Sequence, residues 1–458
     1  MVTLAATGFD QKRLSRPAGI NHLAILAGGK GTRLAAITGA IQKVLVPVGG
    51  KPVLQHHLEW AAASEIEEVT IFAGYRADDV AAFVGDGSKF GLNVRMVVES
   101  EPLGTAGALL GALDLLPEHF FVVYGDVMAE EDLRAVAAAH LAWDADFTMV
   151  AHPNDHPLDS DLLEADLDGR VTAIHACPHP PDASYGNLVN AALYAVRREA
   201  LRPWANASVK RDFVKDIASN LIASRGRVFA YRSSRYLKDM GTPARLQQVE
   251  CDYRLGLIHP KGADGRRPAI FLDRDGTLNA ERGYLRRPEE LELLPGVGAA
   301  LRSLRQAGFR LVVITNQPVV ARGEASEADL VAIHRRLEWE LGKSGAFVDA
   351  IYVCPHHPDR GFPGERADLK FVCDCRKPAT GLIERACRDL RIDIASSWMI
   401  GDQTRDIETA RRAGLRSVLV QTGAAGQDGR FAATPDHVAA DLVAATQTVR
   451  AATQSVGS

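Results

Sequence analysis

Short apolar runs of strand length alternate along the chain with segments of helix length, and this rhythm constrains the fold more than any other feature. In the first half, strands are expected at His22–Leu26, Val69–Ala73, Val94–Val98 and Phe120–Tyr124. Helices are expected at Pro52–Ser64 and Leu103–Leu116. Because strands that alternate with helices usually form parallel sheets covered by helices, the pattern predicts an α/β fold.

The rhythm stops once, at residues 256–268 (GLIHPKGADGRRP), and then starts again. This stretch is rich in glycine, proline and charge, so we expect a linker between a domain at residues 20–255 and another at residues 269–450. The 458 residues are enough for two or three domains. In the second domain, strands are expected at Ala269–Leu272, Arg310–Thr315, Ala350–Cys354, Ser397–Ile400 and Ser417–Val420, before a last helix at His437–Thr448. The expected fold class is α/β, with two Rossmann-like domains in tandem.

Composition and charge exclude several classes of function. Hydrophobic residues make up 47% of the chain and charged residues 24%, as in ordinary globular proteins. The net charge of −4 leaves no basic surplus for nucleic acid or an anionic membrane, and no apolar run reaches the ~18 residues of a membrane-spanning helix. Residues 1–19 lack an apolar core of signal-peptide length, so a cytoplasmic location is expected. The expected partners are small molecules, with a homo-oligomer left open.

A glycine-rich loop, AGGKGTRL at residues 27–34, directly follows the first strand. Glycine lets the backbone approach a phosphate closely, and free amides at the start of a helix favour an anion. The loop matches neither the Walker pattern nor GxGxxG. By itself, it is therefore as consistent with a tight turn as with a phosphate cradle.

Five segments in a fixed order make the interpretation specific. They are LAGGKGTRL at 26–34, KVLVPVGGKP at 43–52, PLGTAG at 102–107, YGD at 124–126 and KDMGTP at 238–243. Together they resemble the sugar-1-phosphate nucleotidyltransferases, over about residues 20–255. The resemblance implies a mixed sheet and a reaction in which a sugar 1-phosphate attacks the α-phosphorus of a nucleoside triphosphate and pyrophosphate leaves.

The same resemblance implies the roles of individual residues. Arg33 and Lys43 would neutralise the triphosphate, and Asp126 and Asp239 would hold Mg²⁺, which prefers such oxygen ligands. The residues expected to bind nucleotide are Gly28, Gly29, Gly31, Thr32, Gly104 and Thr105, and those expected near the sugar phosphate are Asn190 and Lys215. Two departures stand out. Gln42 replaces the usual proline before the lysine, and HACPH at residues 175–179 stands where a Glu-Lys-Pro motif is expected.

The second domain begins with a pair of carboxylates, because the strand Ala269–Leu272 leads directly into DRDGT at residues 273–277. In such a pair, one carboxylate can attack phosphorus while the other handles the proton of the leaving group. Thr315 closes a later strand, Lys377 lies in CRKP, and Asp402 follows another strand. These motifs resemble the haloacid dehalogenase superfamily over about residues 269–450, which implies a parallel sheet.

This resemblance also implies roles. Asp273 would be the nucleophile that forms an aspartyl-phosphate, and Asp275 the general acid and base. Mg²⁺ would be held by Asp273, the Asp275 carbonyl and Asp402. Thr315, Asn316 and Lys377 would bind the transferring phosphoryl group, offsetting its charge near the nucleophile. Asp406 either supports Lys377 or the metal, or it merely favours a helix N-terminus.

Three of the six cysteines lie close together and form, with a histidine, the pattern C-x-H…C-x-C. The four ligands are Cys354, His356, Cys373 and Cys375, with His357 as an alternative to His356. Four soft or borderline ligands suit tetrahedral Zn²⁺ and leave no position for water, so the site is expected to be structural. The ion would staple the loop at residues 353–376 and aim Arg376 and Lys377 at the substrate.

The zinc pattern, together with DRDGTLN, GY, TNQ and ARG, resembles the heptose 1,7-bisphosphate phosphatases and the related histidinol-phosphate phosphatases. It adds substrate-side candidates: Gly283, Tyr284, Gln317, Arg322 and Arg376. Removing the 7-phosphate of a heptose bisphosphate leaves a sugar 1-phosphate, the kind of acceptor that the first domain would use. The fusion therefore resembles a D-glycero-D-manno-heptose 1-phosphate guanylyltransferase joined to a D-glycero-D-manno-heptose 1,7-bisphosphate 7-phosphatase. Its substrates would be heptose phosphates and GTP, and its cofactors Mg²⁺ in both sites and Zn²⁺.

Two alternatives stay open at this point. The chain could perform the same two chemistries on another sugar and another nucleotide. It could also be a histidinol-phosphate phosphatase fused to a non-catalytic nucleotide-binding domain, which Gln42 and the missing Glu-Lys-Pro motif favour. Arg33, Lys43, Asp126 and Asp239 argue against that second alternative.

Overall fold

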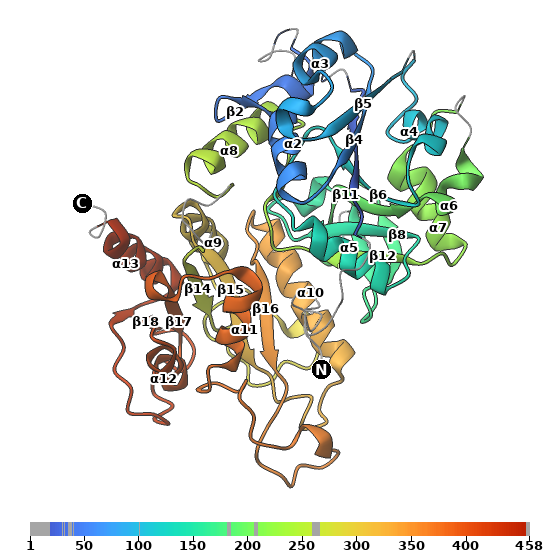
Figure 1. The fold of residues 1–458 in the computed structure, drawn as a ribbon. Coiled ribbons are helices and arrows are strands. Elements are labelled where there is room, and N and C mark those ends of the chain that lie inside the picture. The colour runs from blue at the N-terminus through green and yellow to red at the C-terminus, as the bar shows by residue number, and fades with distance from the viewer. Residues whose placement is uncertain are drawn as a thin grey trace.

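The computed structural model (Figure 1) contains two α/β domains, each built around its own main sheet. It describes residues 19–29, 31, 33–34, 39, 41–99, 101–180, 185–205, 209–258 and 266–454. We call the part from β1 to α8 the N-terminal domain and the part from β14 to α13 the C-terminal domain. Residues 259–265, in the middle of the expected linker, lie outside the described residues, as does Thr32.

The N-terminal domain has a nine-stranded mixed sheet in the order β10-β9-β11-β6-β1-β4-β5, with β8 paired to β11 and to β12. Its strands are β1 (His22–Ala27), β4 (Glu68–Ala73), β5 (Asn93–Val98), β6 (His119–Tyr124), β8 (Phe147–His152), β9 (Leu162–Ala165), β10 (Val171–His175), β11 (Val189–Arg197) and β12 (Val228–Arg232). Strands β1, β4, β5 and β6 are parallel, and β11 is antiparallel to β6. Two small sheets pair β2 (Pro47–Val48) with β3 (Lys51–Pro52) and β7 (Val127–Ala129) with β13 (Leu237–Asp239).

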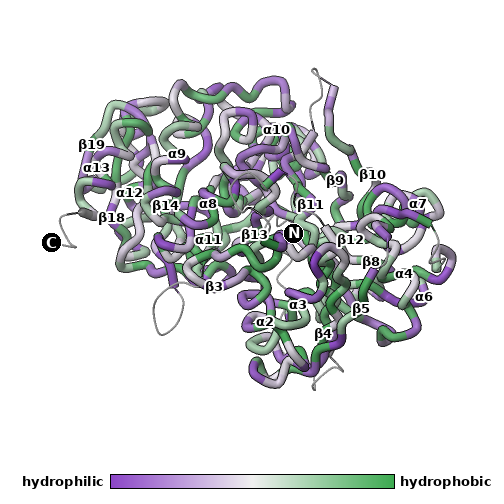
Figure 2. Tube along the Cα trace, turned by 90° about the horizontal axis from the view of Figure 1, so that it is seen from above, coloured by the Kyte–Doolittle hydropathy of each residue, from purple (hydrophilic) through white to green (hydrophobic). Residues whose placement is uncertain are grey.

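Helices cover both faces of this sheet. On one face, Leu23 and Ile25 of β1 belong to the same core as α2 (Val53–Ala63), α3 (Ala77–Val84) and α5 (Leu133–Ala142). On the other face, Ala24 packs in a core with α4 (Gly107–Gly111), α6 (Arg198–Leu201), α7 (Ser219–Ala223) and the π-helix Phe213–Ala218. Strands covered on both sides are apolar along their whole length, which explains the continuous run in β1. In Figure 2, hydrophobic residues gather along interior strands such as β4.

The helix expected at Leu103–Leu116 is wrong in its extent. The structure has only α4 and a 3-10 turn at Leu113–Leu115. Gly104 has a φ of +84°, and a Cβ at this position would collide with the Arg211 carbonyl oxygen. Because the left-handed backbone at Gly104 cannot continue a helix, Leu103–Ala106 forms a loop.

The C-terminal domain has a six-stranded parallel sheet in the order β16-β15-β14-β17-β18-β19. Its strands are β14 (Ala269–Leu272), β15 (Arg310–Asn316), β16 (Ala350–Cys354), β17 (Trp398–Gly401), β18 (Arg416–Val420) and β19 (His437–Ala439). Its helices are α9 (Val297–Gln306), α10 (Glu327–Lys343), α11 (Gly381–Leu390), α12 (Thr404–Ala413) and α13 (Leu442–Gln454). The mixed and the parallel sheet together confirm the expected α/β fold class.

The last helix is also wrong in its extent, because residues 437–439 form the edge strand β19 instead of the start of a helix. His437 pairs in register with Val418 of β18. The helix begins only at Leu442, and the Asp441 carboxylate accepts a hydrogen bond of 2.8 Å from the Ala444 amide. An aspartate in that position caps a helix N-terminus, so the local signal for the later start was present in the sequence.

The two domains contact each other mainly through α10. Arg232 on β12 pairs with Glu338, and Arg335 donates to the Ala165 carbonyl. Trp339 is buried with Leu162 of β9 and Val189 of β11. Among the residues that the structure describes, no helix combines the length and the apolar character that a bilayer crossing requires.

Candidate active sites

The glycine-rich loop follows β1, which lies in the interior of the N-terminal sheet. A Cβ at Gly28 would lie 2.6 Å from the Glu99 Oε1 atom, so the glycine lets this carboxylate approach the loop closely. Gly31 has a φ of +62° and packs on the Lys43 side chain. Gly29 is open, and a Cβ there would meet nothing within 4 Å among the described residues. Arg33 is exposed in the turn that follows.

Glu99 is a residue of this site that the sequence analysis missed. It follows β5 directly, and its Oε2 accepts a hydrogen bond of 3.4 Å from the Leu103 amide. Burial raises the pKa of this carboxyl. Its position gave a signal, because ligands of open α/β sheets bind at the carboxyl ends of the strands. Glu99 therefore brings a carboxylate between the glycine-rich loop and the PLGTAG segment.

The two carboxylates expected to hold Mg²⁺ lie on adjacent chain segments. Asp126 follows β6, and its carbonyl accepts a hydrogen bond of 2.8 Å from the Met240 amide. Asp239 ends β13 and stands opposite Val127 in the β7–β13 pair. Two segments more than 100 residues apart in sequence therefore lie side by side at Asp126 and Asp239. That the two carboxylates share an ion stays a prediction.

Each of these carboxylates faces a cation. Lys43 Nζ pairs with Asp126, and Arg245 Nη1 lies 2.7 Å from Asp239. Although burial raises it, the pKa of Asp239 is held below its ordinary value by the Arg245 guanidinium. Arg245, on α8 (Pro243–Arg254), is a second residue that the sequence analysis did not single out. Each carboxylate is therefore offset by one cation, which leaves little negative charge to repel an anionic substrate.

The remaining residues of this domain that are expected to bind nucleotide or sugar phosphate lie in two different places. Thr105 Oγ1 donates to Asp212 and accepts from the Phe213 amide, which ties the PLGTAG loop to the π-helix. Asn190 on β11 lines the same cavity as Asp239, and its side-chain amide donates to the Tyr194 hydroxyl. Lys215 is exposed on the π-helix and does not line that cavity.

Gln42, the departure from the family pattern, has a clear structural role. Its buried side chain donates a hydrogen bond of 2.6 Å to the Ala27 carbonyl and accepts one of 2.6 Å from the Val44 amide. It therefore connects the end of β1 to the segment that carries Lys43. The glutamine holds these two parts of the site together, so its presence is no sign of a degenerate domain.

In the C-terminal domain, three buried carboxylates converge at the carboxyl end of the sheet. Oxygens of Asp273, Asp402 and Asp406 all lie within 4.8 Å of one another. Lys377 Nζ lies 2.8 Å from Asp273 Oδ1 and 2.8 Å from Asp406 Oδ1. The contact between Lys377 Nζ and Asp406 Oδ1 shows that Asp406 supports Lys377. The other carboxylate oxygen of Asp406, Oδ2, accepts a hydrogen bond from the Gln403 amide at the start of α12. Both functions left open for Asp406 are therefore present.

The charges of this cluster suit a divalent cation. Burial, followed by the charge of Asp406, raises the pKa of Asp273 to about 7, and burial and Asp273 raise that of Asp402 to about 8. Although burial lowers it, the pKa of Lys377 is raised by these carboxylates, so the lysine stays charged. The buried Asp402 Oδ1 has no hydrogen-bond partner among the described residues. Three carboxylates with one lysine leave negative charge and a free oxygen, which fits Mg²⁺.

The second aspartate of the DRDGT motif points to a separate set of partners. Asp275 binds both Nη2 and Nε of the fully buried Arg274, and it accepts a hydrogen bond of 2.7 Å from Gln317. Gln317 also contacts the Thr315 hydroxyl at 2.8 Å. Arg274 is a third residue that the sequence analysis missed, although it lies between the two aspartates. It orients Asp275, whose side chain is not part of the carboxylate cluster around Asp402.

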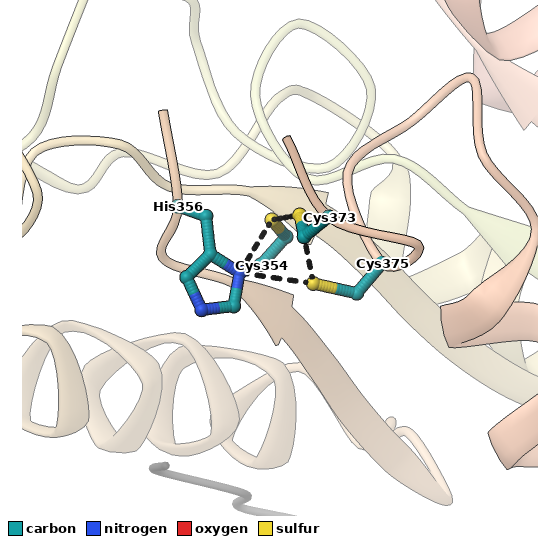
Figure 3. Close-up of side chains that lie close together, drawn as sticks. All are labelled: Cys354, His356, Cys373 and Cys375. Atoms are coloured by element: carbon teal, nitrogen blue, oxygen red, sulfur yellow. Dashed lines mark hydrogen bonds between the residues drawn. The ribbon is translucent and has the colours of Figure 1, made fainter. Parts of the chain in front are cut away.

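The four ligands of the C-x-H…C-x-C pattern form one cluster (Figure 3). The Sγ atoms of Cys354 and Cys373 are 3.6 Å apart, and those of Cys373 and Cys375 are 3.3 Å apart. His356 Nδ1 lies 3.7 Å and 3.2 Å from the sulfurs of Cys354 and Cys375. Two Zn–S bonds of ~2.3 Å at a tetrahedral angle separate their sulfurs by about 3.8 Å, so the cluster has the dimensions of a zinc site.

The choice between the two histidines of the loop is clear. His356 belongs to the cluster, whereas His357 Nδ1 accepts a hydrogen bond from the Asp359 amide. Hydrogen bonding to Cys354 lowers the pKa of Cys373, which favours the thiolate form that binds a metal. All described cysteines are free of disulfides.

The loop that carries the cysteine–histidine cluster also positions some of the substrate-side candidates. Arg376 Nη1 donates a hydrogen bond of 3.1 Å to the His356 carbonyl, and the Lys377 amide donates to Asn316 Oδ1 at 2.9 Å. The guanidinium of Arg322 lies 4.8 Å from the ring centre of Tyr284, next to Gly283, at the exposed side of the domain. Cys375 of the cluster thus directly precedes Arg376 and Lys377, and Lys377 contacts Asp273 of the phosphatase site.

The phosphatase cluster and the contact with the N-terminal domain lie at opposite edges of the C-terminal sheet. Asp273 follows β14 at the carboxyl edge, whereas Arg310 starts β15 at the amino edge and donates 3.0 Å to the Ser234 carbonyl of the N-terminal domain. The seven residues of β15 span about 20 Å. In Figure 1, the orange loop that follows β16 accordingly lies at the end remote from the N-terminal domain.

Comparisons with known proteins match both domains. The sequence model described as "Nucleotidyl transferase" matches residues 23–255, and one described as HAD-hydrolase-like matches residues 374–445. The D-glycero-beta-D-manno-heptose-1,7-bisphosphate 7-phosphatase of Yersinia pestis is 42% identical over 157 residues, which are 34% of this chain and 81% of that protein.

Two solved structures are also similar. HddC from Yersinia pseudotuberculosis, complexed with GMP-PN, is 25% identical with a TM-score of 0.45, and the match covers 51% of this chain and 100% of that one. The D,D-heptose 1.7-bisphosphate phosphatase from B. bronchiseptica, complexed with magnesium and phosphate, is 36% identical with a TM-score of 0.35, covering 40% of this chain and 97% of that one.

Proposed function

The chain belongs to the nucleotidyl transferase family over residues 23–255 and, in its C-terminal domain, to the family of the D-glycero-beta-D-manno-heptose-1,7-bisphosphate 7-phosphatases, and from this premise we propose that it catalyses two consecutive steps of heptose activation. The C-terminal domain, residues 269–450, removes the 7-phosphate of D-glycero-D-manno-heptose 1,7-bisphosphate. The N-terminal domain, residues 20–255, then transfers GMP from GTP to the heptose 1-phosphate and releases pyrophosphate. The product is GDP-heptose.

One observation carries this proposal: a single chain contains both the Asp273–Lys377–Asp402 cluster and the Asp126–Asp239 pair. The first suits removal of a phosphate from an ester, and the second suits attack of one phosphate on another. A heptose bisphosphate connects the two chemistries, because it keeps its anomeric phosphate when the 7-phosphate leaves. Histidinol phosphate has no anomeric phosphate and would give the N-terminal domain no acceptor.

In the phosphatase reaction, Asp273 attacks the phosphorus and forms an aspartyl-phosphate. Lys377, 2.8 Å from the nucleophile, offsets the charge that gathers on the phosphoryl oxygens. Asp275, held by Arg274 and Gln317, protonates the leaving alkoxide and later takes a proton from the attacking water. Mg²⁺ on Asp273 and Asp402, when bound, supplies further positive charge at the phosphate.

In the nucleotidyl transfer, the chain's contribution is positioning and charge rather than a base. The glycine-rich loop and Arg33 receive the triphosphate, and Lys43 neutralises it next to Asp126. Asp126 and Asp239 would hold Mg²⁺, which supplies charge neutralisation between the two phosphates. The zinc ion that we place in the cysteine cluster is structural, because four protein ligands leave no open position.

The choice of GTP is supported by Glu99. Guanine presents two adjacent donors, N1–H and the exocyclic amino group, and a carboxylate has two acceptor oxygens that match them. Uracil and thymine present one donor between two carbonyls, which a carboxylate repels. Glu99 lies between Gly28 of the glycine-rich loop and Leu103 of the PLGTAG segment, two segments that are expected to bind the nucleotide, so it favours guanine over uracil and thymine.

Replacing Glu99 with glutamine should shift the nucleotide preference. We expect kcat/KM for GTP to fall about 100-fold, because the new amide places a donor against the guanine donors, while kcat/KM for UTP stays level or rises. The measurement is steady-state kinetics with each of the four triphosphates. Glu101→Gln, an exposed carboxylate two residues away, is the matched control. Equal losses with every triphosphate would show that Glu99 acts on folding rather than on the base.

The proposed function as a whole is tested by mass spectrometry of the products. The intact chain is incubated with heptose 1,7-bisphosphate, Mg²⁺ and one triphosphate at a time. We expect phosphate, pyrophosphate and GDP-heptose with GTP. Because the phosphatase cluster lies at the carboxyl edge of the C-terminal sheet and the N-terminal domain contacts the amino edge, free heptose 1-phosphate should accumulate before the nucleotide sugar. A nucleotide sugar that retains its 7-phosphate, or faster turnover of histidinol phosphate, would contradict the proposal.

A further inference from the structure

A cavity of about 360 Å³ lies between the two domains, and both domains line it. The N-terminal domain contributes Asn190, Lys238 and Asp239, which belong to the acceptor side of the proposed nucleotidyl-transfer site. The C-terminal domain contributes Arg302, Arg305 and Gln306, which share one face of α9 at the spacing i, i+3 and i+4. A volume of roughly 300–1,000 Å³ is typical for sites that bind small molecules.

We infer that the phosphatase domain supplies one wall of the acceptor pocket of the nucleotidyltransferase domain. In this arrangement, the 1-phosphate of the acceptor lies toward Asp239, and Arg302 and Gln306 bind the hydroxyl groups at the far end of the sugar. The inference rests on the proposed function, and it makes these two residues determinants of sugar specificity. The pocket is complete only when both domains are present in one chain.

Two observations place the α9 face beside the N-terminal domain. Arg310 donates to the Ser234 carbonyl at 3.0 Å, next to the strand that carries Asp239. A Cβ at Gly345 would lie 3.3 Å from Arg302 Nη1 and 3.9 Å from the Asp155 carbonyl oxygen, so α9 and the loop after β8 approach the same point. The wall is therefore built by close contact of the domains.

The arginines of the wall differ in whether their side chains already pair with a carboxylate of the protein. Arg305 is committed to the fold, because it pairs with Asp349 at 2.9 Å and its guanidinium stacks 3.7 Å from the ring centre of Phe347. Arg302 donates to the Ser344 carbonyl, and no carboxylate of the described chain lies within ion-pair distance of it. Arg302 and Gln306 are both exposed. They can therefore offer donors, and Gln306 also an acceptor, to sugar hydroxyls.

The charges around the cavity agree with an anionic, hydroxyl-rich ligand. The C-terminal wall contains three arginines, Arg302, Arg305 and Arg310, with a single aspartate, Asp349. On the other side, Lys238 holds Asp155 at 3.3 Å. Arg245 bridges Asp239 and Asp159, whereas Asp161 and Asp252, which also line the cavity, form no ion pair with another described residue. A sugar phosphate thus enters a pocket that is lined by seven arginine and lysine side chains and six aspartates.

The test is steady-state kinetics of nucleotidyl transfer in the full chain with the variants Arg302→Ala, Gln306→Ala and the double variant. The sugar 1-phosphate is varied at saturating triphosphate, and heptose 1-phosphate is compared with mannose 1-phosphate, which lacks the seventh carbon. We expect the double variant to raise KM for heptose 1-phosphate about tenfold with kcat nearly unchanged, because binding is lost equally in the ground and transition states. Discrimination between the two sugars should fall, and Arg302→Lys should restore part of the affinity.

Three readouts separate this role from a merely structural one. KM for the triphosphate, kcat/KM of the phosphatase and the melting temperature should all match the parent, and Arg411→Ala, an exposed arginine on α12, serves as the matched control. An unchanged KM for the sugar phosphate in the double variant overturns the inference, as does a parallel rise of both KM values with a lower melting temperature. If the proposed function is wrong, the parent protein will use another sugar 1-phosphate better than heptose 1-phosphate. The variants then test the wall with that other sugar.

Discussion

Replacing Asp273 with asparagine should abolish the phosphatase while nucleotidyl transfer stays within about twofold of the parent. The amide keeps the shape of the carboxylate but cannot attack phosphorus, and loss of a catalytic nucleophile typically reduces kcat by ~10⁴-fold or more. The substitution should be tolerated by the fold, because Lys377 retains its contact of 2.8 Å with Asp406. The measurement is phosphate release from heptose 1,7-bisphosphate and pyrophosphate release from GTP with heptose 1-phosphate.

The matched control for this experiment is Asp126→Asn, for which the opposite pattern is expected. Asp126 lies in the N-terminal domain, and Asp273 lies at the edge of the C-terminal sheet opposite to the Arg310–Ser234 contact between the domains, so neither substitution should affect the other reaction. A loss of both activities in either variant would contradict two independent sites. Trapping of labelled phosphate on the parent protein, and its absence in Asp273→Asn, would test the aspartyl-phosphate itself.

The second large effect is expected when the cysteine cluster loses its metal. The purified chain should contain about one zinc ion, and Cys375→Ser should remove it, because the ligand set then falls to three. Structural zinc contributes about 10–16 kcal/mol to the folding of small zinc peptides, so the loop at residues 354–375 should lose its order. Arg376 and Lys377 directly follow Cys375, and phosphatase kcat should therefore fall about 100-fold or more.

Metal content, melting temperature and both activities are the measurements for this variant. Cys251→Ser is the matched control, since Cys251 is an exposed cysteine on α8 outside the cluster. Nucleotidyl transfer should be preserved in both variants. A Cys375→Ser protein that keeps its zinc, or a zinc-free parent with full phosphatase activity, would refute a structural role for this ion.

Features with a local signature could be predicted from the sequence. The strand before DRDGT, the C-x-H…C-x-C spacing and the glycines of the first loop are each short patterns whose chemistry depends on neighbours in sequence. The expected strand Ala269–Leu272 agrees residue for residue with β14. The error at the last helix also has a local cause, because the cap at Asp441 was overlooked in favour of the apolar run before it.

Contacts between distant segments could not be predicted in the same way. Glu99 reaches Gly28 only because β5 lies in the same sheet as β1, two strands away. Arg245 meets Asp239, and Lys43 meets Asp126, through pairings that no spacing in the chain encodes. Such contacts depend on strand order and helix packing, which are properties of the whole domain.

By itself, the sequence determined that the chain contains two successive α/β domains, each with its own phosphate chemistry, and a cysteine–histidine cluster. Each of these features depends on short runs of residues that are close in sequence. Only the tertiary structure decided that the phosphatase site faces away from the N-terminal domain and that α9 lines the cavity with Asp239. The physical reason is that an interface between domains arises from the complementary shape and charge of complete folded surfaces, such as Arg232 with Glu338, and leaves no periodic trace in either segment.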